Sequence, residues 1–143
     1  MEKHFNYKDV PTNYLHCLNA SCTRSVDCLR YQVALRVDAD TSSYHLINPK
    51  YITARKDCQY FRSDCMIRFA LGMKHLFDNL PHAKAIRIRS ILLSHFERNM
   101  YYRFLNKKRL IRQEDQAFIR DVFRSEGIEE EPVFDEYIEQ YDW

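Results

Sequence analysis

Glycine is scarce in this sequence, and long apolar segments are absent. Only Gly72 and Gly127 occur among the 143 residues, so no glycine-rich loop can bring backbone amides close to a phosphate, which excludes a P-loop and a dinucleotide-binding fingerprint. The longest aliphatic run covers residues 91–93, whereas a membrane-spanning helix needs roughly 20 apolar residues. The first twenty residues contain no continuous apolar core, so they do not read as a secretion signal, and we expect a cytoplasmic protein.

Motifs of metal-dependent and nucleophilic enzymes are also absent. The sequence has no His-Glu-x-x-His zinc motif and no Asp-rich calcium loop. Cys65 and His75 fall within one predicted helix, where they would lie roughly 15 Å apart along the axis. They therefore cannot form a nucleophile–base pair. Because nothing supports catalysis, we expect this protein not to be an enzyme.

Length and composition predict one globular unit, and the spacing of apolar residues predicts a mainly α fold. The 143 residues, 45% of them apolar, suffice for one compact core. We expect a cysteine-bearing N-terminal region packed on a helical C-terminal half that contains a candidate helix-turn-helix. The predicted regions are 1–62, cysteine-rich with a candidate metal site; 63–128, helical and basic; and 129–143, an acidic tail.

Apolar spacings of three and four residues predict that most of the chain is helical. A short strand is expected over residues 44–47, and Asn48 with Pro49 resembles either a helix cap followed by proline or a simple turn. The acidic tail is expected to dock a short helix through residues 133–138. The five predicted helices cover residues 25–37, 63–80, 83–97, 100–105 and 114–126. The predicted core contains Ala85, Ile88, Leu92, Phe96, Phe118, Val122 and Phe123.

Charge is distributed unevenly, although the net charge is only +2. Residues 1–49 are balanced, whereas residues 50–112 carry 15 Lys or Arg against four acids and residues 113–143 carry 11 acids against two Arg. This pattern indicates either a basic surface for a polyanion or pairing of the basic middle with the acidic tail. Solvated faces of ordinary helices explain it equally well.

Five cysteines provide the first candidate site. Their odd number, in a chain without a secretion signal, argues against a disulfide framework. Thiolates are strong donors to zinc and iron, and four of them can close a tetrahedral zinc site or hold an iron–sulfur cluster. The alternative is a set of ordinary buried thiols. The predicted ligands are Cys17, Cys22, Cys28 and Cys58, and His16 and Cys65 are the alternative ligands.

A basic, aromatic segment provides the second candidate site. Residues 84–112 contain nine Lys or Arg against the single acid Glu97, interleaved with aromatic residues, a composition that suits nucleic-acid binding. Residues 83–127 are predicted to form a helix, a turn, a short helix, a basic turn and another helix. This order resembles the helix-turn-helix of Cro-like repressors. The match lies in residues 101–109. This sequence departs from the Cro-like pattern at two positions. It has Ile91 where the family has a small residue, and His95 where the family usually has glycine.

This resemblance implies a role for each residue of the segment. In such a motif the second helix lies in the major groove, where Arg side chains reach guanine edges. Phe96, Tyr101 and Phe104 would then lock the two helices together. The resemblance implies that Asn99, Tyr102 and Arg103 face the DNA and that Lys107, Lys108 and Arg109 contact its backbone.

Over its whole length the sequence also resembles a family of small uncharacterised proteins from gut bacteria of the Bacteroides group. The similar pieces are residues 17–30, 47–49, 58–61 and 101–103, with Gln116 downstream. This resemblance implies a single-unit protein and no particular chemistry.

Together the two sites predict a DNA-binding, regulator-like protein with a structural or sensory metal site that holds zinc or an iron–sulfur cluster. Double-stranded DNA is the expected partner. The alternative is a protein-interaction module whose basic face binds an acidic protein and has no role with nucleic acid. Neither function involves a membrane.

Overall fold

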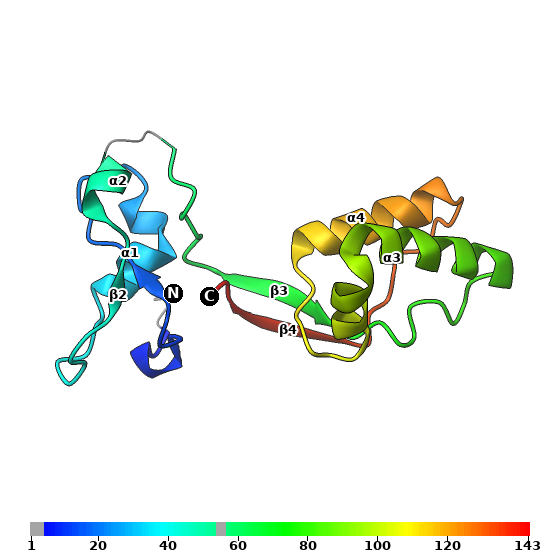
Figure 1. Cartoon of the computed structure of the whole chain (residues 1–143), viewed down its shortest axis with the longest axis horizontal. Coiled ribbons are helices and arrows are strands. Elements are labelled where there is room, and N and C mark those ends of the chain that lie inside the picture. Colours follow the sequence, from blue (N-terminus) through cyan, green and yellow to red (C-terminus); the bar gives the residue numbers. More distant parts are fainter. Residues whose placement is uncertain (1–4, 54–56) are drawn as a thin grey trace. The chain divides into compact units, whose positions relative to one another are not determined.

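The computed structural model describes residues 5–53 and 57–143, which form two compact units. The N-terminal unit contains the described residues up to Met66 together with Tyr141–Trp143, and the C-terminal unit contains Ile67–Gln140. The last three residues therefore belong to the same unit as the first described ones (Figure 1). No helix among the described residues is both long enough and apolar enough to cross a bilayer.

The N-terminal unit consists of short elements joined by turns. Strands β1 (Leu15–His16) and β2 (His45–Leu46) pair in parallel. Its helical elements are the 3-10 helices η1 (Tyr7–Asp9) and η2 (Ser25–Asp27) and the α-helices α1 (Leu29–Ala34) and α2 (Pro49–Thr53). The core contains Phe5, Tyr14, Leu29, Val33 and Tyr141, with Trp143 packed against it. The C-terminal residues thus complete this core.

Two predictions for the N-terminal unit that depend only on neighbouring residues are confirmed: a short strand and a helix that begins at Pro49. The predicted strand is present as β2, and α2 begins at Pro49 behind Asn48, whose Oδ1 accepts a hydrogen bond from the Lys50 amide at 3.1 Å. The helix predicted over residues 25–37 is shorter, because the Leu29 amide donates to the Arg62 carbonyl at 2.7 Å and not to a preceding turn.

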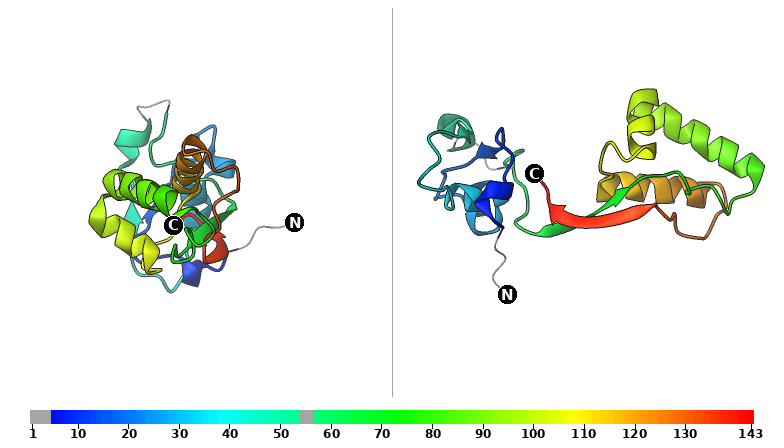
Figure 2. Two further views of the ribbon diagram at one scale, coloured as in Figure 1. Left: turned by 90° about the vertical axis from the view of Figure 1, so that its right-hand side faces the viewer. Right: turned by 90° about the horizontal axis from the view of Figure 1, so that it is seen from below.

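The C-terminal unit combines a two-stranded sheet with two helices. β3 (Met66–Leu71) pairs with β4 (Glu136–Tyr141), and the two strands run in opposite directions (Figure 2). The helices are α3 (His82–Leu105) and α4 (Gln113–Ser125). Glu97, at φ 64° and ψ 155°, interrupts α3 with a kink. Residues 98–105, the second part of α3, therefore run in a different direction from the first part (Figure 1).

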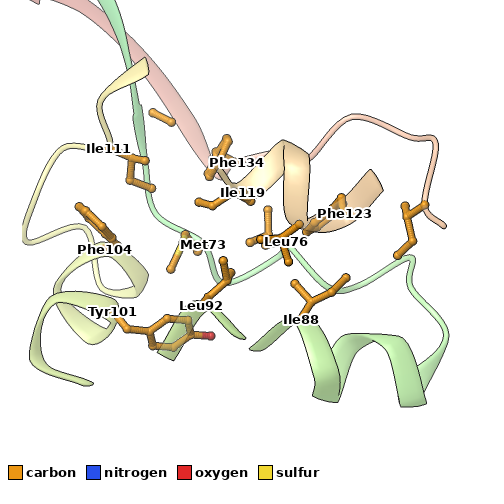
Figure 3. Packing of buried hydrophobic residues seen from close by; sticks show 13 residues of the cluster. Met73, Leu76, Ile88, Leu92, Tyr101, Phe104, Ile111, Ile119, Phe123 and Phe134 are labelled. Atoms are coloured by element: carbon orange, nitrogen blue, oxygen red, sulfur yellow. The ribbon is translucent and has the colours of Figure 1, made fainter. Parts of the chain in front are cut away.

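The core of the C-terminal unit gathers side chains from both helices, from β3 and from the segment before β4 (Figure 3). Tyr101 and Phe104 are 1% and 2% exposed, so the second part of α3 is anchored as firmly as the first. The predicted core is confirmed in most positions. Ala85 is half-buried, Phe96 and Phe118 pack half-buried against the cluster, and the buried members are Ile88, Leu92, Val122 and Phe123.

The prediction of a mainly α fold is wrong. The structure is 39% helical with 14% strand, and the described residues form four α-helices and two small sheets. The largest error lies in residues 63–80, for which a helix was expected and β3 is found. Ile67 and Leu71 fit one helical face, but Ile67, Phe69 and Leu71 also alternate with the period of two that a strand requires. Gly72, at φ 83°, follows the strand.

The acidic tail also forms a strand where a helix was predicted. A short helix was expected through residues 133–138, and residues 136–141 form β4 instead. Pairing with β3 satisfies backbone groups that an isolated tail would leave to water. The partner strand lies far away in the sequence, so the local pattern of the tail does not reveal this pairing.

Candidate functional site

Four cysteines of the N-terminal unit line one cavity of about 350 Å³. They are the four residues predicted as metal ligands: Cys17, Cys22, Cys28 and Cys58. All are free thiols; Cys28 is buried and the others are half-buried. Cys65, the fifth thiol, does not line the cavity and donates a hydrogen bond to Ser63 Oγ at 3.2 Å.

Each cysteine of the cavity is held by a different local structure. The Cys17 amide donates to the Arg30 carbonyl of α1 at 3.2 Å, and the Cys22 amide closes a turn on the Asn19 carbonyl at 3.3 Å. Cys28 directly precedes α1, and its carbonyl accepts the Gln32 amide at 3.0 Å. The Cys58 carbonyl accepts the Phe61 amide at 3.2 Å. Four separate pieces of chain therefore carry the four thiols to one place.

Arg30 connects two segments in the wall of this cavity, a role that was not predicted from the sequence. Its Nε donates to the Tyr60 carbonyl at 2.7 Å and its Nη1 donates to the Leu15 carbonyl at 2.9 Å. The guanidinium also lies 4.6 Å from the Tyr14 ring centroid. One side chain thus fixes the segment before Cys17 to the segment after Cys58. Its carbonyl partners carry no recognisable sequence signal.

The Cys17 thiol is electrostatically linked to the other three thiols. Burial raises the pKa of Cys17 above its usual value, a backbone hydrogen bond from Asn19 opposes this, and Cys28, Cys58 and Cys22 each raise the pKa further. A raised pKa keeps the sulfur protonated at neutral pH, which is the opposite of what a nucleophilic cysteine requires. The four thiols therefore lie close enough for the ionisation of the others to influence that of Cys17.

The arrangement does not match a single bound ion. No group of three or more His, Cys, Asp or Glu side chains within residues 5–53 and 57–143 is placed to hold one metal ion. His16, expected as an alternative ligand, is a buried core residue: its Nδ1 donates to the Tyr14 carbonyl at 2.8 Å, which leaves Nε2 to accept from the Tyr7 hydroxyl at 2.9 Å. Both ring nitrogens are thereby occupied.

The second candidate site lies on the second part of α3 and the turn after it. Tyr101 and Phe104 point into the core, whereas Asn99 and Arg103 are exposed and Tyr102 is half-buried. The Lys108 amide donates to the Arg103 carbonyl at 2.8 Å, which holds the turn directly against the end of the helix. The bend occurs at Glu97, one residue before the expected turn. We call Asn99, Tyr102, Arg103, Lys107, Lys108 and Arg109 together the basic surface.

Acidic side chains neutralise only part of the positive charge. Lys107 forms an ion pair with Glu136 of β4. Arg103, Lys108 and Arg109 are exposed, and none of them has an ion pair with any residue that the structure describes. Three cations next to one another therefore remain available to an external anion.

The structure adds two arginines to the surroundings of Tyr102. Arg89 Nη2 donates to the Tyr102 hydroxyl at 3.3 Å, and the Arg98 guanidinium lies 5.6 Å from the Tyr102 ring centroid. Neither arginine was predicted as part of the site, although the spacing of Arg98 and Tyr102 by four residues is a signal for contact on one helix.

The comparisons with known proteins identify a family and no relative of known activity. The whole chain, residues 1–143, matches the family described as "Family of unknown function (DUF6078)". No curated protein and no solved structure matches the chain.

Proposed function

We propose that this chain, which belongs to the family of unknown function DUF6078, is a DNA-binding, regulator-like protein. Its basic surface would contact duplex DNA. The observation that carries this proposal is the group formed by Arg103, Lys108 and Arg109, which are exposed and have no ion pair among the described residues. A solvated basic side chain adjacent to other basic side chains attracts phosphates and releases counterions when it binds them.

The buried side of the same helix supports a role in recognition. Tyr101 and Phe104 fix the second part of α3 to the core, so its outer face has a defined orientation. Asn99 and Arg103 lie four residues apart on that face, and such side chains can pair with adenine and guanine edges in the major groove. A short, rigid helix that follows a bend is the arrangement that the helix-turn-helix resemblance led us to expect.

The five free thiols support the cellular location that we propose with this function. Thiols persist in reducing compartments, where disulfides are rare. We accordingly place the protein in the cytoplasm, together with its DNA.

The proposal is tested by titrating full-length protein against duplex DNA at low salt, followed by selection from a random duplex pool. Arg103→Ala should weaken binding to the selected sequence by roughly 1–3 kcal/mol and relax the sequence preference. Lys108→Ala should weaken all duplexes alike and reduce the salt slope by about one. Lys74→Ala, which removes an equal charge from the exposed segment between β3 and α3, is the matched control and should change little.

A second candidate function is a protein-interaction module that binds an acidic protein segment. The ion pair between Lys107 and Glu136 favours it, because the chain itself already places a carboxylate on one cation of the basic surface. A poly-glutamate peptide is the appropriate probe. Tighter binding to this peptide than to any duplex, at equal ionic strength, would support the module and refute DNA binding.

A further inference from the structure

We propose that the cavity of the N-terminal unit binds a four-iron iron–sulfur cluster, with each of its four cysteines ligating one iron. This inference is independent of DNA binding and concerns a different unit of the chain. The four thiols are brought together from separate segments, while Cys65 remains outside. Four cysteines around one cavity match the ligand number of such a cluster.

The size of the cavity distinguishes a cluster from a single zinc ion. Thiolates in a tetrahedral zinc site lie about 3.8 Å apart, since each Zn–S bond is about 2.3 Å long. The described residues provide no such close group, yet four thiols surround about 350 Å³ of space. A cluster places its irons at separate corners, and its ligands therefore stand farther apart than those of one ion.

The walls of the cavity suit a buried anionic group. Ile47, Ile52 and Phe61 provide apolar surface that limits the access of water. A cluster with four thiolates carries net negative charge, which is costly to bury without a compensating cation. Arg24 and Arg30 line the same cavity, and the guanidinium carbon of Arg24 lies over the Phe61 ring, 3.4 Å from its centroid.

Binding requires no oxidant or reductant if the cluster is transferred already assembled. Each cysteine thiol replaces a small thiolate on one iron, so one Fe–S bond breaks as another forms. The proton of the incoming thiol passes to the departing thiolate. The oxidation state of the irons does not change, and four small thiols are released for each chain that is loaded.

The test uses full-length protein under anaerobic conditions, with a preassembled four-iron cluster bearing 2-mercaptoethanol ligands as the probe. After gel filtration, wild-type protein should retain four irons and four sulfides per chain with visible charge-transfer absorbance. Cys17→Ser, Cys22→Ser, Cys28→Ser and Cys58→Ser should each lower the retained iron at least several-fold. Cys65→Ser, the matched control, should retain the wild-type amount.

A second measurement on the wild-type chain remains informative if a variant fails to fold. Brief alkylation of the loaded protein followed by peptide mass spectrometry should modify Cys65 and leave the other four thiols protected. Equal modification of all five cysteines would overturn the proposal. So would one zinc ion per chain held by these cysteines together with no retention of the cluster.

Discussion

Gly72 and Asp135 approach each other so closely that a Cβ on Gly72 would lie 2.5 Å from Asp135 Oδ2. The Asp135 amide donates to the Gly72 carbonyl at 3.1 Å, and the Asp135 carboxylate accepts hydrogen bonds from the amides of Lys74 and His75 at 3.0 and 3.1 Å. This contact joins the residue after β3 to the residue before β4. It therefore fixes the end of the β3–β4 pair that lies nearest the helices of the C-terminal unit.

Gly72→Ala should lower the free energy of unfolding by about 1–3 kcal/mol, because the new methyl group meets Asp135 and φ 83° disfavours a side chain. Gly127→Ala is the matched control. Gly127 has a similar φ of 78°, but its nearest neighbour is the flexible Lys84 Nζ at 3.2 Å, so the loss should be smaller. Chemical denaturation measures both variants, and equal losses would contradict the importance of the Asp135 contact.

Glu97→Gly should stabilise the protein, although glycine normally weakens a helix. Glu97 has φ 64° and ψ 155°, a conformation that is nearly restricted to glycine. Removing the side chain relieves about 1 kcal/mol of backbone strain. Ser94→Gly, at an exposed and regular helical position of α3, should instead lower stability. A decrease in the unfolding free energy of both variants would show that the kink carries no strain.

Arg30→Lys should destabilise the N-terminal unit by about 1–3 kcal/mol. A lysine ammonium cannot donate simultaneously to the Tyr60 and Leu15 carbonyls in the geometry of a guanidinium. Trp143 is the single tryptophan and packs against the core of this unit, so its fluorescence reports the transition. Arg24→Lys, which changes an exposed arginine of the same cavity, is the control. An equal loss of stability in both variants would show that the two hydrogen bonds of Arg30 do not hold the N-terminal unit together.

Structural features that depend on residues close together in the sequence were predictable from it. The bend between two helical parts was expected because Asn99 interrupts the apolar stripe of the first part. The helix-turn-helix resemblance implied that Phe96, Tyr101 and Phe104 are core positions, and all three belong to or pack against one core. The strands were missed because the partners Met66–Leu71 and Glu136–Tyr141 are distant in the sequence. The period-two signal in β3 was present, but the helical spacing of Ile67 and Leu71 concealed it.

The same distinction applies to the candidate sites. The residue type, together with the position of four of the five cysteines in the first 58 residues, selected the four residues that line the cavity. The role of Arg30 was not predictable, because it depends on backbone carbonyls that any residue type supplies. Likewise, the pairing of Lys107 with Glu136 requires β4 to lie beside the turn after α3, which charge counting alone does not specify.

Glu136→Gln should raise the affinity for duplex DNA several-fold at low salt. The change releases Lys107 from its ion pair and removes one negative charge from the edge of the basic surface. The salt slope should steepen by about one, since one further phosphate can be neutralised. Glu139→Gln removes the same charge from an exposed position of β4 that has no ion pair among the described residues, and it serves as control. Equal gains for both variants would indicate a general charge effect.

The most direct test of the DNA-binding account is the affinity of the full-length protein for duplex DNA as a function of salt concentration. We expect measurable binding at low salt, with the logarithm of the association constant falling linearly with the logarithm of salt concentration. Replacing the two predicted backbone contacts Lys108 and Arg109 together with alanine should flatten this slope by about two. Absence of binding to any duplex at low salt, by both the wild-type protein and Glu136→Gln, would contradict the account.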